Sequence, residues 1–111
     1  MPAHVGAKLV SWIDAGLVGA LQDGQVISIP VGRRMVAVAR AGNEYFAIED
    51  LCTHDGAELT GAAVEGKEII CPRHGARFCL RTGQALTPPA YEPVATFETK
   101  IADGRLWVRS G

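Results

Sequence analysis

The sequence has almost no net charge and no long apolar run. Eleven Lys and Arg stand against twelve Asp and Glu, so the formal net charge is −1. Nucleic-acid and membrane-surface binding draw on clustered basic side chains, so we expect neither kind of partner. The longest apolar stretch, Met35 to Ala39, has the length of a strand and cannot span a membrane. The N-terminus shows no secretory signal, and we therefore expect a cytoplasmic protein.

Cysteine and histidine are scarce, and most of them fall close together. The three cysteines are an odd number, so a closed disulfide framework would leave one thiol over. In a cytoplasmic chain, thiols are more often metal ligands or buried apolar groups than disulfides. Of the three histidines, His4 lies near the terminus, whereas His54 and His74 each lie within three residues of a cysteine. These two short segments are the candidate site.

Helical periodicity is nearly absent, and alternating apolar residues predict an all-β framework. The turn pairs Gly42-Asn43 and Asp103-Gly104 are typical of two-residue hairpins. We expect a weak edge strand over 8–13 and leave 15–21 as a loop or a short helical turn. The expected framework strands are 25–31, 34–40 with both faces covered, 44–49, 97–101 and 106–108, packed as a small antiparallel sandwich or barrel.

A loop-rich segment of about residues 50–89 interrupts this framework. It is rich in Gly, Pro, Cys and His and has only brief apolar runs. Such a segment lacks a large core of its own, and a bound metal centre can supply the missing order. At 111 residues the chain has the length of one domain, so we predict a single domain over 1–111 with this subdomain inserted in it.

The two candidate ligand segments read Cys52-Thr53-His54-Asp55-Gly56 and Cys71-Pro72-Arg73-His74-Gly75, with sixteen residues between His54 and Cys71. Each therefore holds one thiol and one imidazole, as C-x-H and C-x-x-H, followed by a glycine. This pattern resembles the Rieske iron–sulfur family, in particular the ferredoxins of bacterial aromatic-ring-hydroxylating dioxygenases. The resemblance extends from about residue 25 onward, through 45–48, 74–78, Thr82-Gly83 and Pro88-Pro89.

The resemblance implies a Rieske fold and one [2Fe–2S] cluster. Cys52 and Cys71 would bind one iron, and His54 and His74 the other. The implied function is one-electron transfer, from an NAD(P)H-dependent flavin reductase to a terminal oxygenase, with docking near His54 and His74. All ligand positions would come from the protein, and we see no nucleophile–base pair, so we expect a carrier and no enzyme. Pro88-Pro89 would belong to the segment that covers the cluster.

Two departures from the respiratory branch of the family concern the reduction potential. That branch has cysteines where this chain has Ala57 and Arg73, so a disulfide between the ligand loops is excluded here. It also has Ser and Tyr, which donate to cluster sulfurs, where this chain has Ala76 and Phe78. Fewer donors stabilise the more negative, reduced cluster less. We therefore predict a potential towards the low end of the Rieske range.

Two alternatives remain for the same residues. A structural zinc site takes Cys₂His₂ donors, although its usual spacing pairs like ligands as C-x₂₋₄-C and H-x₃₋₅-H. Such a protein would be a zinc-stabilised interaction module. The small Rieske-like subunit of a nitrite reductase is the rival within the cofactor class. We take Cys79 as a packed residue and not a redox thiol. We also expect the arginines and acids near the site to form a solvated mixed-charge surface (Arg73, Arg77, Arg81, Glu49, Asp50, Asp55 and Glu58).

Overall fold

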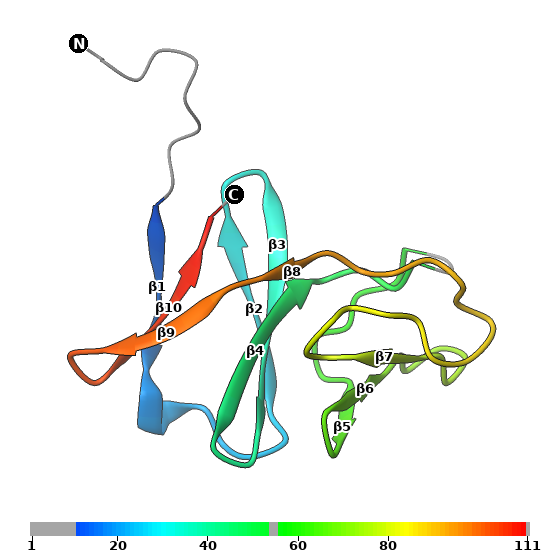
Figure 1. The fold of residues 1–111 in the computed structure, drawn as a ribbon, viewed down its shortest axis with the longest axis horizontal. Helices are drawn as coiled ribbons and strands as arrows, with labels where there is room; N and C mark the ends of the chain where they lie inside the picture. Colours follow the sequence, from blue (N-terminus) through cyan, green and yellow to red (C-terminus); the bar gives the residue numbers. More distant parts are fainter. Residues whose placement is uncertain (1–10, 54–55, 111) are drawn as a thin grey trace, which may run out of the picture.

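The fold is built almost entirely from antiparallel strands (Figure 1). The computed structural model describes residues 11–53 and 56–110. The strands are β1 (Trp12–Leu17), β2 (Val26–Val31), β3 (Arg34–Ala41), β4 (Glu44–Glu49), β5 (Ala63–Glu65), β6 (Glu68–Ile70), β7 (Arg77–Cys79), β8 (Thr96–Phe97), β9 (Thr99–Ala102) and β10 (Arg105–Arg109). A 3₁₀ turn, η1 (Val18–Ala20), follows β1. The all-β prediction is confirmed.

The strands form three sheets, two of which make the framework. One framework sheet has the order β1-β10-β9, and the other has the order β2-β3-β4-β8. The third sheet, β5-β6-β7, is contributed by the segment between β4 and β8 and lies at the opposite end of the molecule from β1 and β9 (Figure 1). The segment that was expected to hold only brief apolar runs therefore has a small sheet of its own.

Strand β3 is the central layer, because both of its faces are buried. Val36 and Val38 pack into the core shared with β10, where Leu106 and Val108 are also buried. Ala37 and Ala39 point the other way, into the core that contains both ligand-segment cysteines. This two-sided burial is what the uninterrupted apolar run predicts, since a strand that is covered on both faces loses the polar alternation. Strand β3 thus connects the framework core to the candidate site.

Local turn chemistry accounts for two of the hairpins. The hairpin β3–β4 turns at Gly42-Asn43 and β9–β10 turns at Asp103-Gly104, as predicted. Strand β1 runs further than expected, to Leu17, and the part of the expected edge strand before residue 11 lies outside the described residues.

The single strand expected over 97–101 is wrong. Phe97 pairs with Ala47 in one sheet, whereas 99–102 pair with β10 in the other. Glu98, at the crossing, is held by Arg109, whose backbone N–H donates to the Glu98 carbonyl and whose guanidinium binds the carboxylate at 2.5 Å. The chain changes sheets at this residue because its backbone and side chain are both tied to β10.

Several contacts connect the segment that contains the β5–β7 sheet to the rest of the fold. The carboxylate of Glu44, in the β3–β4 hairpin, lies 2.6 Å from Lys67 Nζ and 3.5 Å from an Arg81 guanidinium nitrogen. Deeper in the seam, the buried Gly83 accepts a hydrogen bond from Val94 N at 2.8 Å. These contacts fix the site-bearing segment relative to β4.

Candidate metal centre

The two candidate ligand segments are closed by the same pair of backbone hydrogen bonds. In each, the cysteine N–H donates to the carbonyl oxygen of the residue five positions later, at 2.7 Å for both Cys52 to Ala57 and Cys71 to Ala76. Two segments nineteen positions apart in the chain therefore fold into one repeated loop. Each thiol therefore stands at the same position of its loop, which suits a site built by two matching halves.

A glycine closes each loop. Gly56 N donates to the Cys52 carbonyl at 2.7 Å, and Gly75 N donates to the Cys71 carbonyl at 3.0 Å. The two glycines have φ angles of +78° and +74°, in the left-handed region that side chains disfavour. Each loop turns back at the glycine four residues after its cysteine, and this left-handed turn explains why glycine stands there.

The cysteines and His74 lie at different depths. Cys52 is fully buried and Cys71 is 2% exposed, in one core cluster together with Ala76 and Phe78. His74 is exposed, as expected for an imidazole whose outer nitrogen faces solvent. His54 lies outside the described residues. The structure therefore places the two thiols in one apolar core and His74 at the molecular surface.

This donor set fits an iron–sulfur cluster. Two soft thiols in one apolar core are ligands that iron–sulfur clusters and zinc accept, and an imidazole at the rim suits the second iron of a Rieske centre. Ala76 and Phe78 are both fully buried in the same core cluster as the two cysteines. Neither side chain can donate a hydrogen bond to a sulfur there.

Asp50 is a site-supporting residue that the sequence prediction placed wrongly, on a solvated surface. Its side chain is 8% exposed, and Oδ1 accepts hydrogen bonds from Leu59 N at 2.6 Å and Thr60 N at 3.0 Å. Its Oδ2 accepts one from the Thr60 hydroxyl at 2.5 Å. The carboxylate thus holds the backbone of residues 59–60, which follow the first candidate ligand segment, against the end of β4. Its donors lie nine and ten residues ahead, so only the tertiary structure identifies them.

Residues 88–95 form a strap over the same core. Ala90 and Val94 in the strap are 3% and 4% exposed and belong to the cluster that contains Cys52 and Cys71. The Thr53 hydroxyl, in the first ligand segment, donates to the Glu92 carbonyl at 2.7 Å. The Pro88-Pro89 segment is therefore part of a covering element that the ligand segment itself contacts.

Cys79 is separate from the two buried thiols. It is half-buried at the end of β7, and a hydrogen bond from the Thr82 hydroxyl lowers the pKa of its thiol, against the opposing effect of burial. Backbone N–H groups of Thr82 and Arg81 act in the same direction. These contacts stay within the turn after β7, in keeping with a packed residue.

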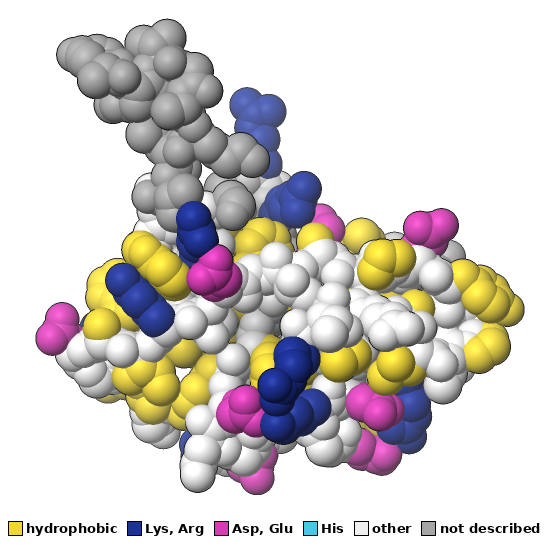
Figure 2. Space-filling view, viewed as in Figure 1, with side chains coloured by type: hydrophobic (Ala, Val, Ile, Leu, Met, Phe, Trp, Pro, Cys, Tyr) yellow, Lys and Arg dark blue, Asp and Glu magenta, His cyan; other side chains and the backbone are white. Residues whose placement is uncertain are grey.

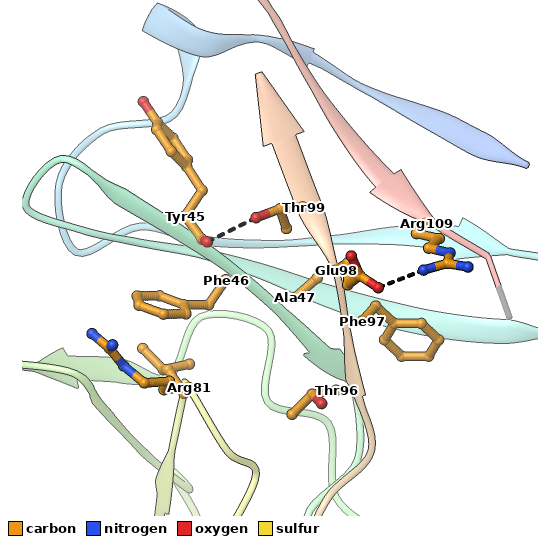
Figure 3. A pocket seen from close by; sticks show the side chains of 10 residues that line it. Tyr45, Phe46, Ala47, Arg81, Thr96, Phe97, Glu98, Thr99 and Arg109 are labelled. Carbon is orange, nitrogen blue, oxygen red and sulfur yellow. Dashed lines mark hydrogen bonds and ion pairs between the residues drawn. The ribbon is translucent and has the colours of Figure 1, made fainter. Parts of the chain in front are cut away.

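A pocket of about 480 Å³ lies in the seam between the framework and the β5–β7 segment. Figure 3 shows the Phe46 ring beside Arg81 and, further along, the Glu98–Arg109 ion pair near the Phe97 ring. Thr99 donates its hydroxyl to the Tyr45 carbonyl at 3.1 Å in the same wall. Neither Cys52 nor Cys71 lines the pocket, and its charged groups are engaged in ion pairs. We do not assign the site chemistry to it.

Surface charges are mixed, as predicted. On the face in Figure 2, basic and acidic side chains lie next to one another. The ion pairs of Arg77 agree with this mixing, because its guanidinium binds Glu65 at 2.9 Å and Glu68 at 3.3 Å. Within 11–53 and 56–110, the structure contains no helix with the length and apolarity that crossing a membrane requires.

Comparison with known proteins identifies the family. Residues 11–98 match the model of the Rieske [2Fe-2S] domain. The chain is 33% identical over 99 residues to the ferredoxin component of the naphthalene 1,2-dioxygenase/salicylate 5-hydroxylase systems of a Ralstonia species, covering 89% of this chain and 95% of that one. It is also 33% identical over 105 residues to the anthranilate 1,2-dioxygenase ferredoxin subunit of Burkholderia cepacia, covering 95% and 97%.

Solved structures agree with this assignment. The ferredoxin of carbazole 1,9a-dioxygenase from Nocardioides aromaticivorans superposes with a TM-score of 0.86 at 27% identity, over 91% of this chain and 99% of that one. A chain in a complex of oxygenase and ferredoxin of carbazole 1,9a-dioxygenase gives 0.83 at 33% identity, over 87% and 91%.

The rival within the cofactor class has weaker support. A protein described as an NADH-dependent nitrite reductase small subunit from Mycobacterium tuberculosis superposes at 0.84 with 18% identity, over 94% and 98%, which shows a common fold alone. The repeated ligand loops, the buried thiols, the family match and the ferredoxin relatives all lead to one assignment. The chain belongs to the Rieske [2Fe–2S] family, as a ferredoxin that carries electrons and is not itself an enzyme.

Proposed function

We propose that Cys52, His54, Cys71 and His74 hold the [2Fe–2S] cluster, with the cysteines on one iron and the histidines on the other. Support comes from the two matching loops, each with a buried thiol, and from the exposed position of His74. When bound, the cluster supplies a one-electron redox centre. The thiols are buried away from water, and Ala90 and Val94 of the strap pack in the same core.

We further propose that this ferredoxin takes electrons from an NAD(P)H-dependent flavin reductase and delivers them to the terminal oxygenase of an aromatic-ring dioxygenase. The observation that carries this proposal is the likeness, over nearly the whole chain, to ferredoxin components of such systems. We place the docking surface near His54 and His74, because electron transfer needs close approach and His74 is exposed. The chain would act in the cytoplasm as one domain, with residues of about 50–89 as its cluster-binding subdomain.

Stopped-flow spectroscopy tests this route. The ferredoxin is mixed with NADH and the purified flavin reductase of an aromatic dioxygenase system, and its visible absorption is followed. The reduced protein is then mixed with oxidised terminal oxygenase. We expect reduction in the first mixing and reoxidation in the second. The proposal would be contradicted if the reductase does not reduce this protein and the oxygenase does not reoxidise it. If the protein instead co-purifies with a large reductase subunit, the nitrite reductase alternative would be favoured.

The variant His74→Cys tests whether His74 is a cluster ligand that also lies on the electron-transfer surface. A thiolate in place of the neutral imidazole adds negative charge at the second iron, which lowers the potential. We expect the variant to bind iron but to receive electrons from the reductase more slowly. Arg33→Ala, on the exposed β2–β3 turn, is the control and should leave the rate unchanged. Unchanged electron transfer by His74→Cys would contradict the assignment of His74.

A further inference from the structure

The strap over this core is secured to the rest of the chain at both of its ends. Its far end is secured on two sides, since Glu49 N in β4 donates to Ala95 O at 2.9 Å and Val94 N donates to Gly83 O, after β7, at 2.8 Å. Its beginning follows Thr87, whose hydroxyl accepts a hydrogen bond from Arg77 N at 3.0 Å. Both anchors lie at the ends of the strap.

The middle of the strap is anchored differently. Residues 88–93 contain three prolines, which have no N–H to donate, so this stretch is poor in backbone hydrogen-bond donors. The bond from Thr53 Oγ1 to Glu92 O, at 2.7 Å, joins two positions thirty-nine residues apart. It connects the residue directly after the buried Cys52 to the covering element.

We propose that Thr53 is a positioning residue whose hydroxyl fastens the strap over the first ligand segment and so limits access of water to the cluster. This role rests on the proposed function and deepens it, because it assigns a positioning task to the residue that lies between two of the proposed ligands in the sequence. Ala90 and Val94 supply the apolar contacts of the closed strap, and the Thr53 hydroxyl keeps them in place.

The role has consequences for the cluster environment. Opening the strap would let water reach a core in which Cys52, Cys71, Ala90 and Val94 are now buried. Water stabilises the more negative, reduced form, because solvent exposure is one of the factors that set the reduction potential of such centres. A looser strap should therefore raise the potential and shorten the lifetime of the cluster.

Thr53→Val tests this role, because valine keeps the shape of threonine and removes the donor. The holoprotein variant is compared with wild type by deuterium uptake of peptides covering 88–95. Loss of one hydrogen bond should increase uptake in the strap by about fivefold, which corresponds to about 1 kcal/mol. Loss of visible absorption in the presence of EDTA should accelerate by a similar factor, and the midpoint potential should rise.

Two further variants separate fastening from general stability. Thr53→Ser keeps the hydroxyl and should behave as wild type. Thr99→Val removes another threonine hydroxyl that donates to a backbone carbonyl, Tyr45 O, in the framework, and should leave uptake in the strap unchanged. If Thr53→Val fails to fold, Thr53→Ser decides, because a serine variant with an open strap overturns the proposal.

Wild-type uptake in Thr53→Val would also overturn it. Iron and sulfide analysis of the wild-type protein tests the proposed function independently. A chain without a cluster would refute that function. The deuterium uptake of the strap in the variants would still show whether the Thr53 hydroxyl fastens the strap.

Discussion

Gly83 is the position at which we expect an added methyl group to disturb the seam between the framework and the β5–β7 segment most. A Cβ atom there would overlap the carbonyl oxygen of Val94 and lie 3.0 Å from Thr96 Cγ2. The obstacle is backbone, which cannot rotate away as the end of a long side chain can. Gly83→Ala must therefore push the strap off the seam.

The cost has two parts. Gly83 has a φ of +79°, and a left-handed conformation costs alanine about 1 kcal/mol. Displacing Val94 breaks its hydrogen bond to Gly83 O and leaves buried polar groups unpaired, at about 1–3 kcal/mol. The sum, about 2–4 kcal/mol, is a large share of the roughly 5–15 kcal/mol by which folded domains are stable.

Urea unfolding of the holoprotein, followed by circular dichroism, measures this cost. Gly66→Ala is the matched control, since Gly66 also has a left-handed φ, +59°, but a Cβ there meets nothing within 4 Å. We expect Gly66→Ala to lose only about 1 kcal/mol, for the φ angle alone. Equal losses in the two variants would show that the close approach of Val94 to Gly83 contributes nothing, and would refute the reasoning.

Three other predictions follow from the site. Asp50→Ala removes the acceptor of three hydrogen bonds and should lower the free energy of unfolding in urea by about 3 kcal/mol. Asp50→Asn should be less harmful because it keeps one acceptor oxygen, and equal losses in the two variants would contradict the role of these hydrogen bonds. Voltammetry should give a midpoint below zero, near the lower end of the roughly −150 to +300 mV Rieske range, because buried Ala76 and Phe78 donate nothing; a clearly positive midpoint would show that side-chain donors do not set it. The pKa of the Cys79 thiol lies below the ordinary 9.0, chiefly through the Thr82 hydroxyl, so the thiolate forms at lower pH; iodoacetamide labelling followed by mass spectrometry should shift to higher pH in Thr82→Val, and an unshifted profile would speak against that hydrogen bond.

Local patterns in the sequence were sufficient for most of the framework. The apolar run in β3 predicted a strand covered on both faces, and the structure buries Val36 and Val38 on one face and Ala37 and Ala39 on the other. The two-residue turns at 42–43 and 103–104 followed from glycine next to Asn or Asp. These features depend on neighbouring residues alone, so single-sequence reasoning reached them.

The features that were missed depend on distant partners. The change of sheet at Glu98 requires the position of Arg109, eleven residues later. Asp50 is one of several acids near the ligands, and nothing in the sequence distinguishes the one that binds the amides of Leu59 and Thr60. The Thr53 hydroxyl binds the backbone carbonyl of Glu92, so this hydrogen bond does not depend on which side chain stands at position 92. Hydrogen bonds to the main chain are largely invisible to residue patterns for this reason.

The ligand set is intermediate between these cases. Spacing predicted four ligand residues and left zinc open, the family match supports the cluster, and the assignment of the four residues stays a prediction. The structure added the repetition of one loop geometry at Cys52 and Cys71, which two C-x-H-like motifs of unequal length do not reveal. The unequal spacing is accommodated because the closing glycine stands four residues after the cysteine in both loops.

The most direct test of the account is the metal content of the protein purified without oxygen. Iron, acid-labile sulfide and zinc are measured per chain, together with the visible spectrum before and after dithionite. Our account predicts two irons and two sulfides, with colour that bleaches on reduction. One zinc with no sulfide and no colour would contradict it and make this chain a zinc-stabilised module.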